Sequence, residues 1–385
     1  MLMRLFPVGD QRETTTACGP FELLMRLWRH LEQRRRRQFA QLTVLMIVSA
    51  LLETISLGAI IPFLGALAAP DKILALPIAA NLAHWLGLKE GRDLLLPLSL
   101  LFATATTTSA AVRVALVWGN TRLTYAVGAD FSIESYRRTL YQPYQVHIAR
   151  NSSIVVSTIS AKISVAVSVL YQITTLLSSS ILSVAVIAAL IAIDPLITLG
   201  AGGTFATLYF LLMRRFKQTL FSNSTWSARQ EDYAIKILQE GVGGIRDVLL
   251  NSAQATYANK YSDIMRRLRA VQATNVFIAI SPRYIMEAVG MLIIVSIAYV
   301  LSVQQEGTTL FMALPVLGAF ALGAQRLLPT MQQIYAAWVG VLGNQGAVID
   351  VLAMLDQPAP AMSSACRDTT AQNLPPFTHI VSLRG

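Results

Sequence analysis

The sequence predicts an all-α membrane protein with six transmembrane helices and long cytoplasmic helical extensions. Apolar residues make up 54% of the 385 residues and charged residues 14%, well below the roughly 25% charged residues of a soluble domain. The mean hydropathy is +0.53. The apolar residues fall into six long spans, and the connections between the spans differ greatly in length and charge.

The six spans follow from length, because a helix needs about 20 apolar residues to cross the hydrocarbon core of a bilayer. Asp194 and Pro195 alone separate the third span from the fourth, which predicts a tight helical hairpin. Together the spans define one domain over residues 39–345. The predicted spans are residues 39–67, 94–118, 163–193, 196–213, 284–303 and 311–341.

The distribution of Lys and Arg predicts the orientation. Eight lie in residues 1–38, five in 119–162 and eleven in 214–283, whereas residues 68–93 hold three that acidic neighbours balance. Cytoplasmic loops carry the excess of Lys and Arg in membrane proteins. We therefore expect a multi-pass protein of the inner (cytoplasmic) membrane with both termini in the cytoplasm. The net charge of +10 then reports orientation, and no nucleic-acid partner is expected.

The N-terminal region is predicted as a disordered tail over residues 1–20 and an interfacial elbow helix over residues 21–38. Apolar residues recur there at helical spacing, and four consecutive arginines follow, as in a helix that lies among lipid headgroups. An ordinary amphipathic helix followed by a stop-transfer charge run predicts nearly the same geometry. The apolar residues are Phe21, Leu24, Met25, Trp28 and Leu31.

The two large connections, of 44 residues (119–162) and 70 residues (214–283), are rich in helix formers. Two helices of about 30 residues would project about 45 Å at 1.5 Å per residue. The longer connection has EGVGGIRD (240–247) at its expected tip, where three glycines permit a reversal. The shorter has YQPYQVHIARNSS (141–153), in which a proline breaks the incoming helix. A plain turn between helices explains both tips equally well.

Four stretches resemble the transmembrane domain of ABC exporters of the MsbA-like type, in particular the PglK-like flippases of lipid-linked oligosaccharides. The resemblance covers about residues 21–357. It rests on the four stretches themselves and on their order along the chain. The stretches are ETISLGAIIPFLGAL (53–67), RNSS (150–153), EGVGGIRDVLL (240–250) and GAFALGAQRLLPTMQQI (318–334).

The resemblance implies a homodimer that encloses a cavity, a lipid or glycolipid substrate, and two cytoplasmic tips that dock on an ATP-binding domain. That domain would drive the spans through the helical extensions, which are the rigid elements touching both. The residues expected to couple the chain to the ATPase are Tyr144, Gln145, His147, Arg150, Glu240, Gly243, Gly244, Ile245 and Arg246.

The chain departs from that family because it contains no GxxxxGK[ST] phosphate loop, no LSGGQ-like signature and no acidic Walker B strand. We therefore expect no enzymatic activity and no cofactor in this chain; ATP and Mg would belong to the missing domain. Residues 346–385 are predicted as a linker and the start of that domain. Whether the domain is a separate polypeptide, lost or cropped stays open, and a non-functional truncated transporter is one alternative.

Three arginines in or beside the spans, Arg113, Arg283 and Arg326, are the predicted substrate-binding residues. Charges are costly in hydrocarbon, and arginine suits phosphate recognition, so we expect contact with a phosphorylated lipid headgroup. Snorkelling or helix capping also explains Arg283, and pairing with a glutamate also explains the other two.

Two glutamates near the spans, Glu53 and Glu287, motivate another class, a proton-coupled secondary transporter. No inverted repeat supports that class. The four histidines are scattered and the two cysteines, Cys18 and Cys366, lie in no metal-binding spacing. No catalytic residue and no metal site are therefore predicted.

Overall fold

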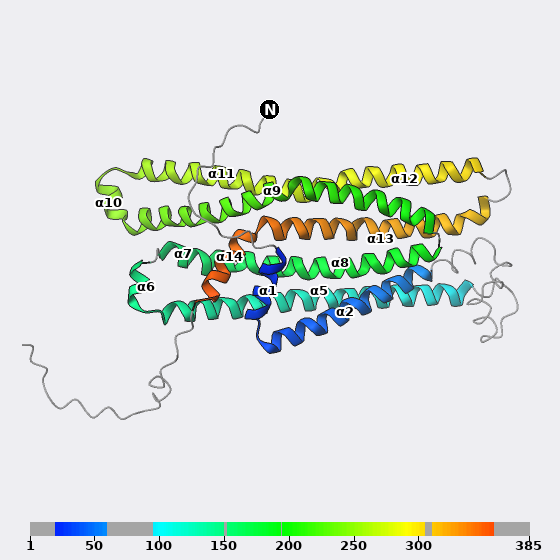
Figure 1. Cartoon of the computed structure of the whole chain (residues 1–385), viewed down its shortest axis with the longest axis horizontal. Helices are drawn as coiled ribbons and strands as arrows, with labels where there is room; N and C mark the ends of the chain where they lie inside the picture. Colours follow the sequence, from blue (N-terminus) through cyan, green and yellow to red (C-terminus); the bar gives the residue numbers. More distant parts are fainter. Residues whose placement is uncertain (1–19, 60–94, 150–151, 194, 305–309, 358–385) are drawn as a thin grey trace, which may run out of the picture.

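The computed structural model describes residues 20–59, 95–149, 152–193, 195–304 and 310–357. Apart from short turns these residues are helical, and they contain no β-strand. Figure 1 shows the long helices side by side along the longest axis of the molecule, with two short helices, α1 and α14, lying across them. The helices are α1 (Pro20–His30), α2 (Gln33–Gly58), α5 (Leu95–Leu140), α6 (Tyr144–Ala149), α7 (Ser152–Ser157), the π-helix η2 (Thr158–Lys162), α8 (Ile163–Ile193), α9 (Pro195–Gly243), α10 (Ile245–Leu250), α11 (Gln254–Ile280), α12 (Pro282–Gln304), α13 (Leu310–Gly343) and α14 (Gln345–Leu355).

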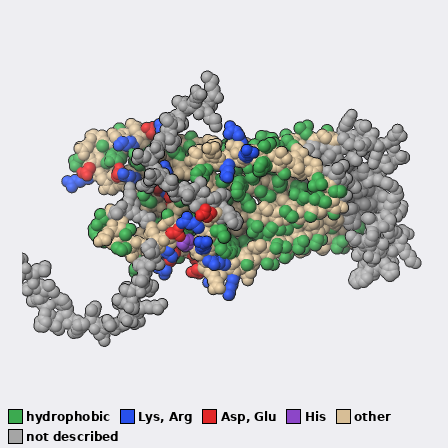
Figure 2. Space-filling view, in the orientation of Figure 1, with side chains coloured by type: hydrophobic (Ala, Val, Ile, Leu, Met, Phe, Trp, Pro, Cys, Tyr) green, Lys and Arg blue, Asp and Glu red, His purple; other side chains and the backbone are tan. Residues whose placement is uncertain are grey.

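Three helices among the described residues are long and apolar enough to cross a membrane: Gln33–Ser56, Leu95–Leu140 and Ser152–Ala192. A bent pair, Gln325–Gly343 and Gln345–Leu355, makes a fourth if it is counted as one span. Figure 2 shows hydrophobic side chains over the half of the bundle away from α6 and α10, and most charged side chains over the other half. The chain is thus an all-α membrane protein with three or four candidate spans.

Helices occupy the described residues of the predicted spans except Ala59, which follows the end of α2, but only three or four of them are candidate spans. The third span, residues 163–193, has the same bounds as α8, and α9 begins one residue before the fourth, at Pro195, a favoured residue for the first helical position. Several predictions lie outside the described residues: most of the tail 1–20, the end of the first span from residue 60, Arg150 and the tail from residue 358.

The predicted helical extensions are present because α5 and α9 continue far beyond their apolar spans. The 46 residues of α5 and the 49 residues of α9 correspond to about 69 and 74 Å at 1.5 Å per residue. The hydrocarbon core is about 30 Å thick. Each helix is therefore more than twice as long as the core is thick, and α11 returns alongside α9.

Both extensions reverse at the same end of the bundle through a short crossing helix (Figure 1). α5 ends at Leu140, and Pro143 precedes α6, since proline cannot continue the incoming helix. On the other extension α9 ends at Gly243, and α10 follows after a single residue. The chain then turns through Ser252, whose φ of 50° is left-handed. Each predicted tip thus contains a short helix.

The N-terminal helix is shorter than the predicted elbow helix over residues 21–38. α1 ends at His30, and the arginines 34–37 belong to the first turns of α2. Leu23, Leu27 and Leu31, four residues apart, are buried, because this spacing places them on one face of a helix. That face packs against α14.

The two largest apolar clusters among the described residues hold most of the helices together. The larger joins α1, α2, α5, α8, α13 and α14 around Val127, Ala166 and Val351, each with no exposed surface. The smaller joins α9, α11, α12 and α13 around Met286 and Tyr335. Polar pairs between helices, such as Ser183 Oγ donating to Thr330 Oγ1 at 2.9 Å, add specific contacts between α8 and α13.

The predicted linker from residue 346 begins as part of the bundle. α14 follows α13 after a 56° bend at Asn344, and Val351 and Leu352 in it are buried. α14 contacts α8, α9 and η2. A linker would not need an apolar face. Because α14 has one and buries it against these helices, the bundle extends to about residue 355.

Gly346 is required where α14 crosses α9. A Cβ at this position would lie 2.8 Å from the Ser224 carbonyl oxygen and 3.1 Å from the Ala228 Cβ, and backbone cannot move aside easily. We expect Gly346→Ala to lower the free energy of unfolding by about 1–3 kcal/mol, measured by thermal unfolding in detergent. Gly202→Ala in α9, with nothing within 4 Å of its Cβ, is the matched control and should be neutral or slightly stabilising; equal effects of both substitutions would contradict the assigned contact.

Candidate functional site

Two of the three predicted substrate-binding arginines converge on one buried carboxylate. Glu53 on α2, 1% exposed, accepts a hydrogen bond from Arg113 Nη1 on α5 at 3.2 Å and a second from Arg326 Nη1 on α13. Both bonds reach the same oxygen, Oε1. The cluster therefore ties three helices of the bundle together, and it contains the Glu–Arg pair that the sequence allowed.

The charge and exposure of this cluster differ between its members. Two guanidinium groups and one carboxylate carry a net charge of +1, while the Arg113 and Arg326 side chains remain 44% and 35% exposed. An additional anion could thus approach both arginines from the exposed side. The third arginine, Arg283, instead donates to Glu287 at 2.9 Å one turn along α12, and both side chains are exposed.

The predicted coupling residues that the structure describes lie on the two tips. Tyr144, Gln145 and His147 belong to α6 and are exposed; Glu240 and Gly243 end α9, and Gly244 separates it from α10. Ile245 and Arg246 begin α10 and are exposed. The apolar side chains exposed at the tips are Tyr144, Val146 and Ile148 on α6 and Val242, Ile245, Leu249 and Leu250 on or beside α10.

A buried lysine at the base of the shorter extension was missed in the sequence analysis. Lys162, the last residue of η2, has no exposed surface. Its Nζ lies 2.6 Å from Asp232 Oδ1 on α9 and 2.5 Å from Asp350 Oδ2 on α14, and Ser157 Oγ donates to the same Asp232 oxygen at 2.5 Å. We call Lys162, Asp232, Asp350 and Ser157 the lysine network. It joins both extensions and α14 at one point.

The π-helix η2 and the partly buried side chain of Glu231 lie next to the lysine network. A π-turn inserts one residue into a helix and is frequent at functional sites; here it ends at Lys162. Burial raises the pKa of Glu231, which the positive charge of Lys162 opposes. Glu231 therefore gains a proton more readily than an exposed glutamate does.

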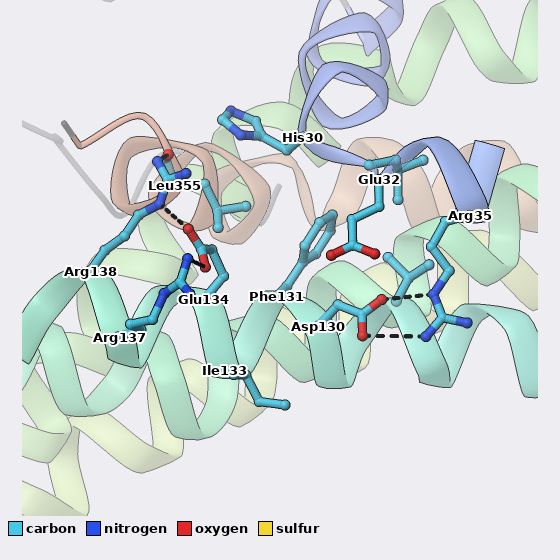
Figure 3. Close-up of a pocket in the computed structure, with 12 residues that line it drawn as sticks. His30, Glu32, Arg35, Asp130, Phe131, Ile133, Glu134, Arg137, Arg138 and Leu355 are labelled. Carbon is cyan, nitrogen blue, oxygen red and sulfur yellow. Dashed lines mark hydrogen bonds and ion pairs between the residues drawn. The ribbon is translucent and has the colours of Figure 1, made fainter. Parts of the chain in front are cut away.

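A polar cavity of about 390 Å³ lies between α1, α2, α5 and the end of α14 (Figure 3). Five of its charged side chains are paired within the wall: Arg35 Nε donates to Asp130 at 2.7 Å, and Glu134 accepts from Arg137 and Arg138. Arg138 also donates to the carbonyl oxygen of Leu355. The cavity walls thus stabilise the junction of α14 with α5.

The end of α14 is also tied to α1. Asp356 bonds Arg26 Nη2 at 2.5 Å and His30 Nε2 at 2.8 Å. Desolvation raises the pKa of Asp356, but the hydrogen bonds with His30 and Arg26 and their charges outweigh it, so the pKa lies below the usual value. The carboxylate therefore stays ionised to a lower pH than an isolated aspartate does, and the contact weakens as the pH falls through the lowered pKa.

Within the described ranges no group of three His, Cys, Asp or Glu side chains could hold a metal ion. Comparison with known proteins adds no identity, since no family model and no curated protein matches the chain.

Proposed function

We propose that this chain is the membrane-spanning part of an ATP-driven exporter or flippase of the ABC type. In this proposal six helices cross the inner membrane, both termini and both tips lie in the cytoplasm, and two copies form the transporter. An ATP-binding domain outside this sequence supplies the hydrolysis. The cargo is a lipid-linked or glycolipid molecule with a phosphorylated headgroup.

The observation that carries the proposal is the pair of exposed apolar tips at one end of the bundle (Figure 1). Tyr144 on α6 and Leu250 on α10 are 77% and 73% exposed, and both tips lie at the end carrying most of the charged side chains (Figure 2). Clustered apolar side chains outside the membrane are typical of surfaces that bind another protein. A partner that holds both tips could move α5 and α9 together.

The lysine network supports a mechanical role for the extensions. Because Lys162 binds α9 and α14 at once, a displacement of either tip would be transmitted to the other extension. Two sites are coupled when an element in contact with both has discrete arrangements. Through the network the two extensions and α14 would move as one rigid unit. The chain continues from α14 to the C-terminal tail.

The Glu53 cluster supports an anionic cargo. Arg113 and Arg326 share one carboxylate and keep part of their surface exposed, so a phosphate could bind without an unpaired charge becoming buried. Arg283 already bonds Glu287 on its own helix. We therefore assign the headgroup contact to Arg113 and Arg326 and not to Arg283.

The coupling proposal is tested by cross-linking. Cysteines at Gln145 and Ile245, both exposed, should each form a cross-link to an ATP-binding domain supplied in trans, and the yield should change with nucleotide. A cysteine at exposed Val114 on the apolar part of α5 is the control and should not react. Absence of a cross-link at both tips would contradict the coupling assignment.

The cargo proposal is tested with a charge-neutral replacement of the whole cluster. The variant Glu53→Gln/Arg113→Gln/Arg326→Gln leaves no buried unpaired charge, so the reassembled transporter should fold while transport of a phosphorylated lipid falls by about 10²-fold or more. Translocation in vesicles is the measurement, and Arg283→Gln is the control that should transport normally. Normal transport by the triple variant would remove the arginines from the headgroup site.

A further inference from the structure

A second surface, distinct from the tips and the Glu53 cluster, is an apolar groove of about 330 Å³ between α1, α2 and α8. We call it the α1 groove. α1 lies across the long helices at this point (Figure 1). The side chains that define the groove include Leu24, Trp28, Ala40, Thr43, Met46 and Leu177.

The groove is lined mainly by apolar side chains, and the hydroxyl groups in its wall donate hydrogen bonds to other protein atoms. Thr43 Oγ1 donates to the carbonyl oxygen of Phe39 at 2.9 Å. Thr174 Oγ1, also in the wall, donates to Asn120 Oδ1 at 2.5 Å. Neither hydroxyl proton is therefore available to a polar ligand, and the walls suit an alkyl chain.

The groove runs along two helices that are candidate membrane spans. It follows α2 from Phe39 to Met46 and α8 from Leu170 to Leu177, about 10 Å along each helix at 1.5 Å per residue. Both stretches lie within candidate spans. On the α1 side of the groove lies Trp28, which is 43% exposed. Tryptophan is enriched where membranes meet water.

Positive charge precedes the lining residues Phe39 and Ala40 on α2. Arg36 lies three and four residues before Phe39 and Ala40, on the same face of α2. Its guanidinium donates to the carbonyl oxygens of Leu31 and Arg29, which leaves its charge without a carboxylate in the part of the chain that the structure describes. Exposed Arg34 and Arg37 lie beside it. Such a cluster beside a membrane helix attracts anionic lipids.

We infer that the α1 groove holds one resident anionic phospholipid, with an acyl chain along α2 and α8 and its phosphate beside Arg36. The lipid fills the space beneath α1 and links this helix to the bundle. This site is separate from the cargo site at Arg113 and Arg326 and does not rest on the proposed transport function.

The experiment is native mass spectrometry of the full chain in detergent with equal amounts of phosphatidylglycerol and phosphatidylcholine that carry the same acyl chains. We expect one retained lipid per chain and a preference for phosphatidylglycerol of about tenfold or more. Ala40→Phe fills the groove mouth and should lower retention by about tenfold or more. Ala115→Phe, at an exposed position of α5 outside the groove, should retain the lipid.

A second variant tests the headgroup. Arg34→Gln/Arg36→Gln/Arg37→Gln should bind both lipids nearly equally, and hydrogen exchange over residues 20–30 should verify that α1 still forms. The inference is overturned if Ala40→Phe retains lipid as the unaltered chain does. It is also overturned if the unaltered chain retains both lipids equally, or if a second copy of the chain rather than a lipid covers the groove.

Discussion

Lys162→Met should lower the free energy of unfolding by about 3–5 kcal/mol, the cost of removing one partner of a buried ion pair. The substitution keeps the aliphatic volume but leaves Asp232 and Asp350 facing each other across the space that held the ammonium group. Thermal unfolding in detergent measures the loss. Hydrogen exchange should increase over η2 and α14 before the apolar half of the bundle responds.

The matched control is Lys236→Met on α9. Lys236 pairs with Glu240 at 3.7 Å, and both side chains are about half exposed, so its removal should cost less than about 1 kcal/mol. The charge-neutral variant Lys162→Met/Asp232→Asn/Asp350→Asn should recover most of the lost stability, because no charge then remains unpaired. Equal losses in Lys162→Met and Lys236→Met would show that the lysine network does not hold the extensions together.

Glu53→Gln should be the second most damaging substitution, at about 3 kcal/mol. It leaves Arg113 and Arg326 close together without the carboxylate that they share. Partial exposure of both arginines allows some hydration, which keeps the expected loss at the lower end of the range. Unfolding monitored by circular dichroism in detergent is the measurement.

A double-mutant cycle separates attraction to Glu53 from repulsion between the arginines. Glu53→Gln/Arg326→Gln should be more stable than Glu53→Gln alone, because one of the two unbalanced charges is gone. The control Glu287→Gln breaks the exposed pair on α12 and should cost under about 1 kcal/mol. Additive effects of the Glu53 and Arg326 substitutions would contradict the shared ion pair.

The helices could be predicted from the sequence because their signals are local. The long apolar run of residues 163–193 gives α8, and Pro143 and the glycines after Glu240 mark the two reversals. The apolar spacing of Leu23, Leu27 and Leu31 likewise predicts an amphipathic N-terminal helix. The break before Gln33 was not predicted, since the arginines that follow favour a helix as strongly as the residues before them.

The contacts between helices could not be predicted in the same way. Lys162 meets partners 70 and 188 residues away in the chain, and no local pattern indicates which carboxylates a lysine will reach. The Glu53 cluster was only partly foreseen, because intramembrane charges imply some partner but not that two arginines share one. α14 was missed because its apolar face is short and follows a predicted domain boundary.

The contact between α1 and Asp356 joins residues 330 positions apart, which has a consequence for the order of assembly. At a synthesis rate of about 5–20 residues per second, α1 is complete about 15–70 s before Asp356 has been synthesised. During that interval Leu23, Leu27 and Leu31 have no α14 to cover them, and an amphipathic helix in this state partitions to the membrane surface. Although α1 is made before the other described helices, it is therefore among the last of them to dock, and its docking reports that the bundle is complete as far as Asp356.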